Sequence, residues 1–345
     1  MIIGELNDIA RRLVAPKKGI LAADESTNTI KRRFDSINVE STEQSRRDYR
    51  EMLFRTPGAN EFISGVILFD ETLRQRSADG GLIVNLLREH SIIPGIKVDK
   101  STNPLANADG ELITDGLDGL RERLHEYHAL GARFAKWRAV ITIGENSNGN
   151  SIPSQYCIDA NAHALARYAA LSQEAKLVPI VEPEVLMDGD HSIEECHDVT
   201  LNALHSTYDQ LARQRVDLTG TLLKANMVVS GKDAADRADA HDVATRTLDC
   251  LMRAVPPAVP GVVFLSGGQA DDEATENLNA INRSAEYINA PWELSYSFGR
   301  ALQAAPLKAW GGDSANNEAA QQEYYRRAML TSAARQGKYT PDMGT

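Results

Sequence analysis

The stretch "GTLLKANM" at residues 220–227 combines a strand pattern with a charged side chain. Two leucines, a β-branched threonine and the valines that follow predict a buried strand. Lys224 lies in the middle of it. A lysine is rarely buried without a partner or a role, because an unpaired ammonium group loses its water at a high cost. The stretch therefore raises two questions: which fold contains such a strand, and what the lysine does there.

Seven other runs rich in Val, Ile, Leu and Phe predict strands of the same kind. They are "GILAAD" (19–24), "FISGVILF" (62–69), "IPGIKVD" (93–99), "FAKWRAVITI" (134–143), "VPIVEPEV" (178–185), "GVVFLSGG" (261–268) and "LSYSFGRAL" (294–302). We expect the strand with Lys224 to cover 220–229. Apolar residues recur at helical spacing between the strands, as in "ANAHALARYAALSQEA". The strands start at intervals of roughly 30 to 45 residues, the length of a strand, a helix and two loops.

Eight such units in one series predict an α/β protein, a single-domain (β/α)8 TIM barrel with eight parallel strands. An open doubly wound sheet would normally carry a GxGxxG fingerprint, and the sequence has none. No linker or repeat divides the chain, so we expect one domain over residues 1–345. The end of the chain is predicted to be helical over 316–336 and to finish in a short tail from about residue 338.

The composition and the net charge limit the classes of function and the cell compartments that suit this protein. The chain has 345 residues and a formal net charge of -11, which argues against non-specific binding to nucleic acid or to an anionic membrane. Cys157, Cys196 and Cys250 lie far apart without CxxC spacing, as is typical of free thiols in a reducing compartment. We expect neither a signal peptide nor a membrane span, which would need ~20 apolar residues. The protein is therefore expected to be cytoplasmic.

Charged side chains fall at the ends of five predicted strands, where a barrel of this type carries its active site. They are Asp24, Lys97, Lys136, Arg138, Glu182, Glu184 and Lys224. Because side chains alternate along a strand, Lys136 and Arg138 project to the same side. The same holds for Glu182 and Glu184. One such lysine could instead snorkel or form a structural ion pair, but charges on five strand ends are costly to bury unless they are used.

This set of residues favours covalent chemistry. Loss of water and neighbouring cations favour the neutral amine of a lysine such as Lys224, and the neutral amine is the nucleophile. It attacks a carbonyl carbon, while a glutamic acid protonates the hydroxyl that departs as water, and a Schiff base results. The protonated imine is an electron sink. It permits cleavage or formation of the adjacent carbon–carbon bond.

Three segments predict anion binding. "LSGGQ" (265–269) and "SFGRAL" (297–302) supply backbone amides and Arg300 at the place where barrels often hold a phosphate, although Ser-Gly-Gly alone is usually just a turn. "DESTNTIKRR" (24–33) opens a helix that Ser26 or Thr29 could cap. The candidate site holds six cations against Asp24, Glu182 and Glu184, namely Arg33, Lys97, Lys136, Arg138, Lys224 and Arg300. A doubly phosphorylated ketose would suit it.

Ten motifs taken together resemble those of the class I fructose-1,6-bisphosphate aldolases. They are "KGILAADEST", "GVILFDETL", "PGIKVDK", "FAKWR", "VPIVEPE", "GTLLKANM", "VPPAVPGVVFLSGGQ", "SFGRALQ", "KAWGG" and "QGKYTP". They occur in the family's order between Lys18 and Pro341. The resemblance implies a lyase that reversibly cleaves fructose 1,6-bisphosphate to dihydroxyacetone phosphate and glyceraldehyde 3-phosphate, in glycolysis or gluconeogenesis. It implies neither a cofactor nor a metal, and a homo-oligomer, commonly a tetramer.

The resemblance also assigns roles. Lys224 would form the Schiff base and Glu182 would be the general acid and base, while Glu184 and Lys136 set the charge of these two groups. Asp24 would lie near the C4 hydroxyl. The C1 phosphate would bind to Ser266, Gly267, Gly299 and Arg300. The C6 phosphate would lie toward Ser26, Thr29, Arg33 and Lys97, and Arg138 would also contact the substrate.

The sequence departs from the family pattern in three places. Ala225 follows the lysine where proline is common, and Thr29 stands where serine is usual. Animal relatives continue past "GKYTP" into a tail whose terminal tyrosine assists proton transfer on the enamine. We therefore expect either another group in that role, or a different rate and a different preference for the bisphosphate. Nothing in the sequence places Tyr339 at the site.

Alternatives stay open. The main substrate could be another phosphorylated ketose, such as fructose 1-phosphate or sedoheptulose 1,7-bisphosphate. A metal-dependent aldolase would need clustered histidines. His125 and His128 fall on a charged helix pattern and the other six histidines are scattered, so we expect them to be solvated. A non-catalytic binding scaffold is the alternative from a different class.

Overall fold

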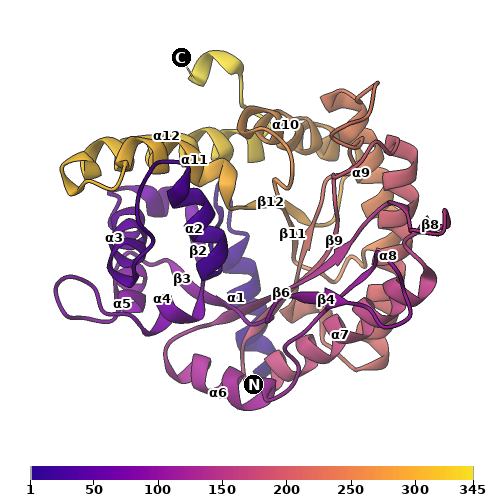
Figure 1. The fold of residues 1–345 in the computed structure, drawn as a ribbon, viewed down its shortest axis with the longest axis horizontal. Helices are drawn as coiled ribbons and strands as arrows, with labels where there is room; N and C mark the ends of the chain where they lie inside the picture. Colours follow the sequence, from indigo (N-terminus) through magenta and orange to yellow (C-terminus); the bar gives the residue numbers. More distant parts are fainter. Residues whose placement is uncertain (1, 345) are drawn as a thin grey trace.

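The central element of the computed structural model, which describes residues 2–344, is a closed barrel of parallel strands (Figure 1). The strands are β1 (Gly19–Ala23), β2 (Ile63–Leu68), β3 (Ile93–Lys97), β6 (Phe134–Ile141), β9 (Val178–Val185), β10 (Leu222–Ala225), β11 (Gly261–Phe264) and β12 (Glu293–Phe298). They follow one another around the barrel in chain order, and β12 closes it against β1. The predicted α/β barrel of eight parallel strands is confirmed. Met1 and Thr345, the ends of the expected domain, lie outside the described residues.

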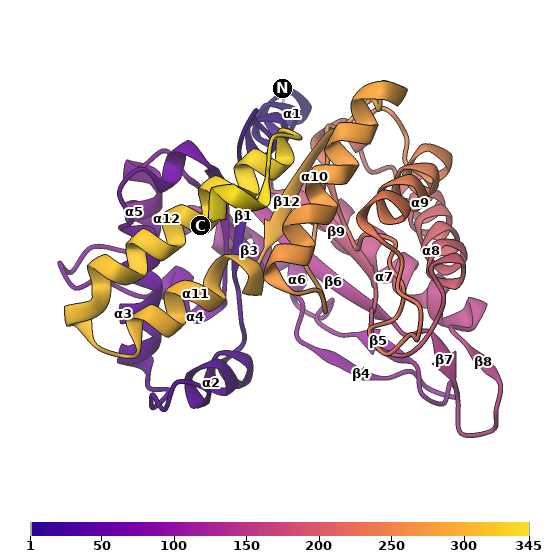
Figure 2. The same cartoon turned by 90° about the horizontal axis from the view of Figure 1, so that it is seen from above.

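Helices surround the barrel, as Figures 1 and 2 show. They are α2 (Thr27–Asp35), α3 (Glu43–Phe54), α4 (Asp70–Arg74), α5 (Ile83–Glu89), α6 (Leu120–Ala129), α7 (Gln155–Glu174), α8 (Ile193–Arg213), α9 (Ala240–Ala254), α10 (Asp271–Ile288), α11 (Arg300–Trp310) and α12 (Asn317–Arg335). Two antiparallel hairpins also form, β4 (Thr102–Pro104) with β5 (Leu112–Thr114) and β7 (Gly144–Glu145) with β8 (Ser151–Ile152). Short 3-10 helices cover Ala59–Glu61, Leu218–Gly220, Ser314–Asn316 and Pro341–Gly344.

Several strands are shorter than their apolar runs predict. β9 has the predicted bounds, but β10 ends at Ala225 instead of continuing to 229. The next residues are buried in a loop whose polar groups bond to helices: Asn226 donates to Thr200 of α8, and Val228 N donates to Thr247 of α9. β12 ends at Phe298, and Arg300 begins α11. An apolar run indicates that the segment is buried, but not that it is a strand, because a loop covered by helices is buried as well.

The interior of the barrel is divided into an apolar layer and a charged layer. The helix α1 (Ile2–Leu13) packs Leu6, Ile9 and Leu13 into one cluster with apolar side chains of the strands. Two residues further along, the strands carry charge instead. The successive pairs are Ala22 and Asp24, Phe134 and Lys136, Ile180 and Glu182, and Leu222 and Lys224. Since side chains two apart share a face, this pattern stacks the charged groups above the apolar ones, at the C-terminal ends of the strands.

Within residues 2–344, no helix combines the length and the apolar character that crossing a membrane demands.

Candidate active site

A cavity of 470 Å³ lies at the C-terminal ends of the barrel strands. All fourteen residues predicted for the site line it: Asp24, Ser26, Thr29, Arg33, Lys97, Lys136, Arg138, Glu182, Glu184, Lys224, Ser266, Gly267, Gly299 and Arg300. They come from seven of the eight strands or from the loops that follow them. The closure of the barrel brings together groups that are up to 276 positions apart in the sequence.

Lys224 lies on β10 and is only 5% exposed. Its Nζ is 3.0 Å from Oε1 of Glu182 on the neighbouring β9. The other carboxylate oxygen of Glu182 lies 3.3 Å from Nζ of Lys136, which also contacts Oδ2 of Asp24 at 2.8 Å. The four side chains thus form one chain of alternating charge, Asp24, Lys136, Glu182 and Lys224.

This chain of charges determines protonation. Burial by itself would raise the pKa of Asp24, but Lys136 and Lys224 outweigh burial and hold the pKa below its usual range. The pKa of Glu182 is likewise lowered, since its burial is opposed by Lys136, Lys224 and Arg138. For Lys136, burial acts to lower the pKa, and the carboxylates of Asp24 and Glu182 raise it. Both carboxylates are therefore ionised near neutral pH, and Lys136 is charged.

Arg138 and Glu184 form a further pair of charges beside this chain of four side chains. Arg138 Nε donates to Glu184 Oε2 in a short contact, and the two residues line the same cavity, as strand alternation predicts. Beside Arg138, on the neighbouring strand β3, Lys97 Nζ donates to the carboxylate of Asp99 and to the Asp99 carbonyl at 2.9 Å. The second oxygen of Asp99 accepts from Arg138 N at 3.3 Å. Asp99 therefore links strand β3 to β6 at the cavity wall.

The loops after β11 and β12 offer backbone amides. A Cβ at Gly267 would lie 2.6 Å from Leu265 Cδ1 and 2.9 Å from Glu184 Oε1, so this approach to Glu184 requires glycine. Gly299 is the N-cap of α11, and no side chain caps this helix start. Free N–H groups at a helix N-terminus bind anions. Arg300, the next residue, donates to the Gln269 carbonyl, and no carboxylate lies within ion-pair distance of it among residues 2–344.

The start of α2 lines the cavity beside the loop that follows β12, because β1 pairs with β12 and a Cβ on Gly299 would lie 3.9 Å from Arg33 Nη2. Ser26 occupies the N-cap position, as expected, but its side chain makes no capping hydrogen bond. The hydroxyl groups of Ser26 and Thr29 lie 3.2 Å apart instead. Arg33 Nη1 is 2.6 Å from Oε1 of Glu25. Two hydroxyls and one guanidinium group thus face the cavity from one helix.

Sequence reasoning missed two acidic residues that line the cavity, Glu25 and Asp99. They bring the total to six cations and five carboxylates, so the excess of positive charge is smaller than the count made from the sequence. The signal was present, because Glu25 follows Asp24 in "ADEST" and Asp99 lies two positions after Lys97. Ser297 was also missed, and its buried hydroxyl lines the cavity without a hydrogen-bond partner.

Glu25 is held in place from outside the cavity by a buried arginine. Arg50 on α3 is 1% exposed and donates to the Glu25 carbonyl at 2.8 Å and to Thr72 Oγ1 at 2.6 Å. Gln303 Nε2 donates to Glu25 Oε1 at 2.7 Å. These contacts join α3 and α11 to the loop that carries Asp24. Arg50 therefore supports a wall of the cavity without lining it.

We expect Arg50→Met to destabilise the fold by about 3–5 kcal/mol, because it removes one of the two cations paired with the buried Glu25 and leaves the Glu25 carbonyl and Thr72 without the hydrogen bonds of Arg50. Urea denaturation monitored by circular dichroism measures this loss. Arg11→Met is the matched control, since Arg11 is exposed on α1 without a partner among the described residues, and a change within about 0.5 kcal/mol is expected there. Equal midpoints for the two variants would contradict the prediction.

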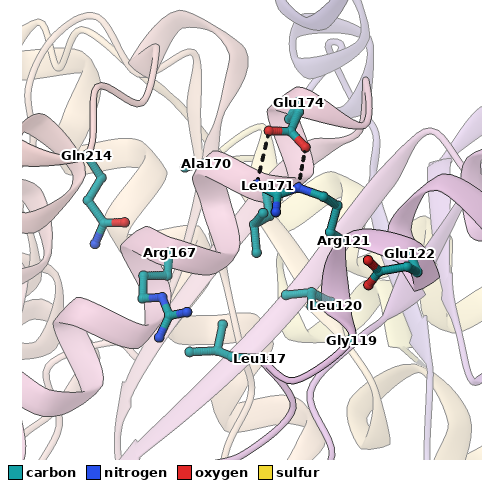
Figure 3. A pocket seen from close by; sticks show the side chains of 10 residues that line it. All are labelled: Leu117, Gly119, Leu120, Arg121, Glu122, Arg167, Ala170, Leu171, Glu174 and Gln214. Atoms are coloured by element: carbon teal, nitrogen blue, oxygen red, sulfur yellow. Dashed lines mark hydrogen bonds and ion pairs between the residues drawn. The ribbon is translucent and has the colours of Figure 1, made fainter.

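Another cavity, of 490 Å³, lies outside the barrel (Figure 3). It is lined from α6, α7 and the end of α8, and Leu117, Leu120 and Leu171 form part of its wall. Arg121 Nε and Glu174 Oε1 form an ion pair of 2.7 Å across it, and both side chains are about half exposed. None of the predicted site residues lines this cavity. Its charges are solvated, in contrast to the buried chain around Lys224.

The histidines do not follow one pattern. His125 is exposed, as expected, but His191 and His197 are buried, so a solvated role for all of them is wrong. His197 Nε2 lies 2.8 Å from Asp249 Oδ2, and both ring nitrogens of His191 lack a hydrogen-bond partner. Burial lowers the pKa of His191. Among residues 2–344, no three His, Cys, Asp or Glu side chains group in a way that could hold a metal ion.

Tyr339 lies beyond the end of α12 and does not line the cavity. It is 8% exposed, and its backbone N–H donates to Asn279 Oδ1 on α10 at 3.0 Å. Tyr339 therefore packs against the outer helix α10.

The sequence and the fold are similar to those of known proteins. The family model "Fructose-bisphosphate aldolase class-I" matches residues 5–345. A protein of Xanthomonas campestris pv. campestris described as "Probable fructose-bisphosphate aldolase class 1" is 54% identical over 340 residues, which cover 98% of this chain and 99% of the relative. "Fructose-bisphosphate aldolase 4, cytosolic" of Arabidopsis thaliana is 52% identical over 98% of this chain and 84% of its own.

The fold is similar to a solved structure of fructose-bisphosphate aldolase from Plasmodium falciparum in complex with TRAP and a small molecule inhibitor. The TM-score is 0.95 at 49% sequence identity, and the match covers 98% of this chain and 96% of the other. Sequence and fold agree over nearly the full length of the chain.

Proposed function

This chain belongs to the class I fructose-bisphosphate aldolase family and is a lyase with that activity, and we propose that Lys224 is the residue that forms the Schiff base. One observation carries the proposal: the 3.0 Å contact between Lys224 Nζ and Glu182 Oε1 in a buried site. A carboxylate at this distance can take a proton from the ammonium group directly. The transfer leaves a neutral amine beside a glutamic acid.

The first half of the reaction follows from that pair. The neutral amine of Lys224 attacks the C2 carbonyl of the open-chain ketose, and a carbinolamine forms. Glu182, now protonated, donates its proton to the hydroxyl on C2, which leaves as water, and the nitrogen becomes an iminium. Lys136 lies 3.3 Å from Glu182 Oε2, where its positive charge favours the return of Glu182 to the carboxylate form. Glu184, paired with Arg138, lies beside it.

Cleavage of the C3–C4 bond needs a base and an electron sink. Asp24 is ionised, partly buried and 2.8 Å from Lys136, and we assign to it the proton of the C4 hydroxyl. As that proton leaves, the C4 oxygen forms the aldehyde, and the C3–C4 electrons move into the iminium to give an enamine. Glyceraldehyde 3-phosphate departs. Protonation at C3 and hydrolysis of the imine then release dihydroxyacetone phosphate and regenerate Lys224.

Two sets of residues that line the cavity would bind the two phosphates. We place the C1 phosphate on Ser266, Gly267, Gly299 and Arg300, where free amides lie beside a guanidinium group. We place the C6 phosphate toward Ser26, Thr29, Arg33 and Lys97, and Arg138 would also contact the substrate. Basic groups in both sets favour a bisphosphate as the preferred ketose. Fructose 1-phosphate and sedoheptulose 1,7-bisphosphate are the alternatives to test against it.

Three broader proposals accompany this assignment. We propose one domain, because the barrel spans Gly19 to Phe298 and α12 packs back on α10 and α11. A cytoplasmic location is supported by the Arabidopsis relative described as cytosolic and by three cysteines without a disulfide. A homo-oligomer, with a tetramer as the expected form, rests on family resemblance.

Borohydride trapping tests the proposed nucleophile. The protein is reduced with borohydride in the presence of dihydroxyacetone phosphate and EDTA, digested and analysed by mass spectrometry. We expect one covalent adduct, on the peptide that contains Lys224. An adduct on another lysine would refute the assignment. Activity without any adduct would refute the imine mechanism for this chain, and loss of both activity and adduct would favour the binding scaffold.

A further inference from the structure

Ser101 has an unusual backbone conformation. Within residues 2–344, eight residues other than glycine have positive φ. Seven of them lie between 50° and 67°, in the left-handed helical region, namely Lys17, Asn38, Ser91, Asn107, Lys176, Arg215 and Asn289. Ser101 alone has a φ of 96°, which a side chain with a Cβ rarely adopts. Such a residue persists only where the surrounding structure enforces its conformation, and sites of this kind cluster at ligand-binding positions.

Contacts on both sides of Ser101 enforce its conformation. Lys100 N donates to the Asp115 carbonyl at 2.8 Å, and Asp115 N donates to the Ser101 carbonyl at 2.9 Å. The hairpin of β4 and β5 continues this pairing from Thr102. Gly116 packs so closely that a Cβ on it would lie 3.0 Å from Lys100 N. The segment that carries Ser101 is therefore clamped between its hairpin and the preceding strand.

Ser101 lies at the end of the cavity where we place the C6 phosphate. It lines the catalytic cavity together with Ser26, Lys97 and Asp99. These four residues also line an adjoining cavity of 550 Å³. The side chain of Ser101 is exposed, and its hydroxyl has no hydrogen-bond partner among the described residues. Of the eight residues with positive φ, Ser101 is the one that lines either cavity.

The tether of Lys97 strengthens this placement. Lys97 Nζ donates to the Asp99 carbonyl at 2.9 Å, so its ammonium group is held against the segment that leads to Ser101. The ammonium group and the serine hydroxyl thus lie on one short stretch of chain at the cavity wall. Lys97 and Ser101 both line the catalytic cavity and the adjoining cavity, and such a pair suits a phosphate, whose oxygens accept from an ammonium group and from a hydroxyl.

We propose that Ser101 is a specificity residue, whose hydroxyl donates a hydrogen bond to the phosphate on C6 of the substrate beside Lys97. The proposal rests on the proposed function, since it places the substrate with C1 at Arg300 and C6 at Lys97. The clamped backbone keeps the hydroxyl at the cavity wall despite an unfavourable φ. A ketose that lacks the second phosphate gains nothing from this group. Ser101 therefore discriminates bisphosphates from monophosphates.

The test compares two variants on two substrates. Ser101→Ala removes the hydroxyl and keeps the Cβ, and Ser101→Gly removes both. For fructose 1,6-bisphosphate we expect kcat/KM to fall by about tenfold in each variant, mainly through KM, the size of one lost hydrogen bond to a charged group. For fructose 1-phosphate, which has no C6 phosphate, we expect a change of less than about twofold.

Stability measurements separate the effect of losing the Ser101 hydroxyl from the effect of relieving its backbone conformation. Ser101→Gly is expected to raise the urea midpoint, because glycine adopts a φ of 96° without a steric cost. Ser101→Ala keeps the Cβ and should leave the midpoint unchanged. The matched control is Ser91→Gly, a serine at a φ of 58° that lines neither cavity, for which kcat/KM should stay the same on both substrates.

Two results would overturn the proposal. Equal losses on both substrates in Ser101→Ala would show a general effect on the site, and no loss on either would show that the hydroxyl does not contact the phosphate. Trapping of dihydroxyacetone phosphate on Lys224 in the same variants distinguishes a failure of the role proposed for Ser101 from a failure of the proposed function. If trapping persists without discrimination, only the role of Ser101 fails. If wild-type protein does not trap the ligand on Lys224, the proposed function fails and the role of Ser101 fails with it.

Discussion

Replacement of Lys224 by methionine is expected to reduce kcat for cleavage of fructose 1,6-bisphosphate by about 10⁴-fold or more, the scale seen when a covalent nucleophile is removed. Methionine has a similar volume and no amine, so the buried position stays filled. Glu182 keeps its contact with Lys136 at 3.3 Å, which limits the structural effect. Steady-state cleavage, coupled to consumption of glyceraldehyde 3-phosphate, measures the loss.

The control for this variant lies on the same side of the barrel. Lys232 is in the loop that follows β10, is about half exposed and pairs with Asp188, so Lys232→Met should keep its activity. Circular dichroism and a urea midpoint check that both variants are folded. A folded Lys224→Met protein with more than a few per cent of wild-type kcat would exclude Lys224 as the nucleophile.

The second large effect is expected for Glu182→Gln, a change that preserves shape and removes the proton acceptor. We expect kcat to fall by about 10²- to 10⁴-fold, the usual contribution of general acid–base catalysis. The amide cannot take the proton of Lys224 at 3.0 Å, nor can it protonate the hydroxyl that leaves as water. Formation of the imine therefore slows, and the yield of borohydride adduct per minute should fall together with kcat.

Glu174→Gln provides the comparison. Glu174 pairs with Arg121 in the outer cavity (Figure 3), where both side chains are solvated, and its loss should leave kcat unchanged. The same substitution thus separates a carboxylate in the buried chain of charges from one in a surface ion pair. If Glu182→Gln kept kcat within about threefold of wild type, proton transfer would have to be assigned to another group.

Much of the barrel and of the site could be predicted because both depend on local patterns. The apolar runs located all eight barrel strands, and β9 has the predicted bounds. The alternation of side chains correctly placed Glu182 with Glu184, and Lys136 with Arg138, on the wall of one cavity. Lys224 follows Leu222 by two positions in the same way, so its direction is a property of the strand. These features depend only on residues that lie within a few positions of one another in the sequence.

Other features depend on contacts between distant parts of the chain. Glu25 meets Gln303, which is 278 positions away, and Arg50 reaches it from another helix. The φ of Ser101 results from the hairpin that closes through Asp115. Neither the hydrophobic periodicity nor the residue propensities predict these contacts, because each contact forms only when the barrel has closed. For the same reason, β10 ends at Ala225 where helices α8 and α9, and not a neighbouring strand, supply the hydrogen bonds.

The sequence by itself thus determined the barrel, the side of each strand that carries charge, and the residues that could supply an amine, an acid and two phosphate sites. Tertiary structure alone decided how those charges pair, which of them keep a free face toward the cavity, and that Glu25 and Asp99 offset much of its positive charge. The physical reason is the distance along the chain over which each property is determined. The direction of a side chain along a strand is set by its neighbours, whereas the partner and the protonation of a buried charge are set by whatever the fold places within about 4 Å of it.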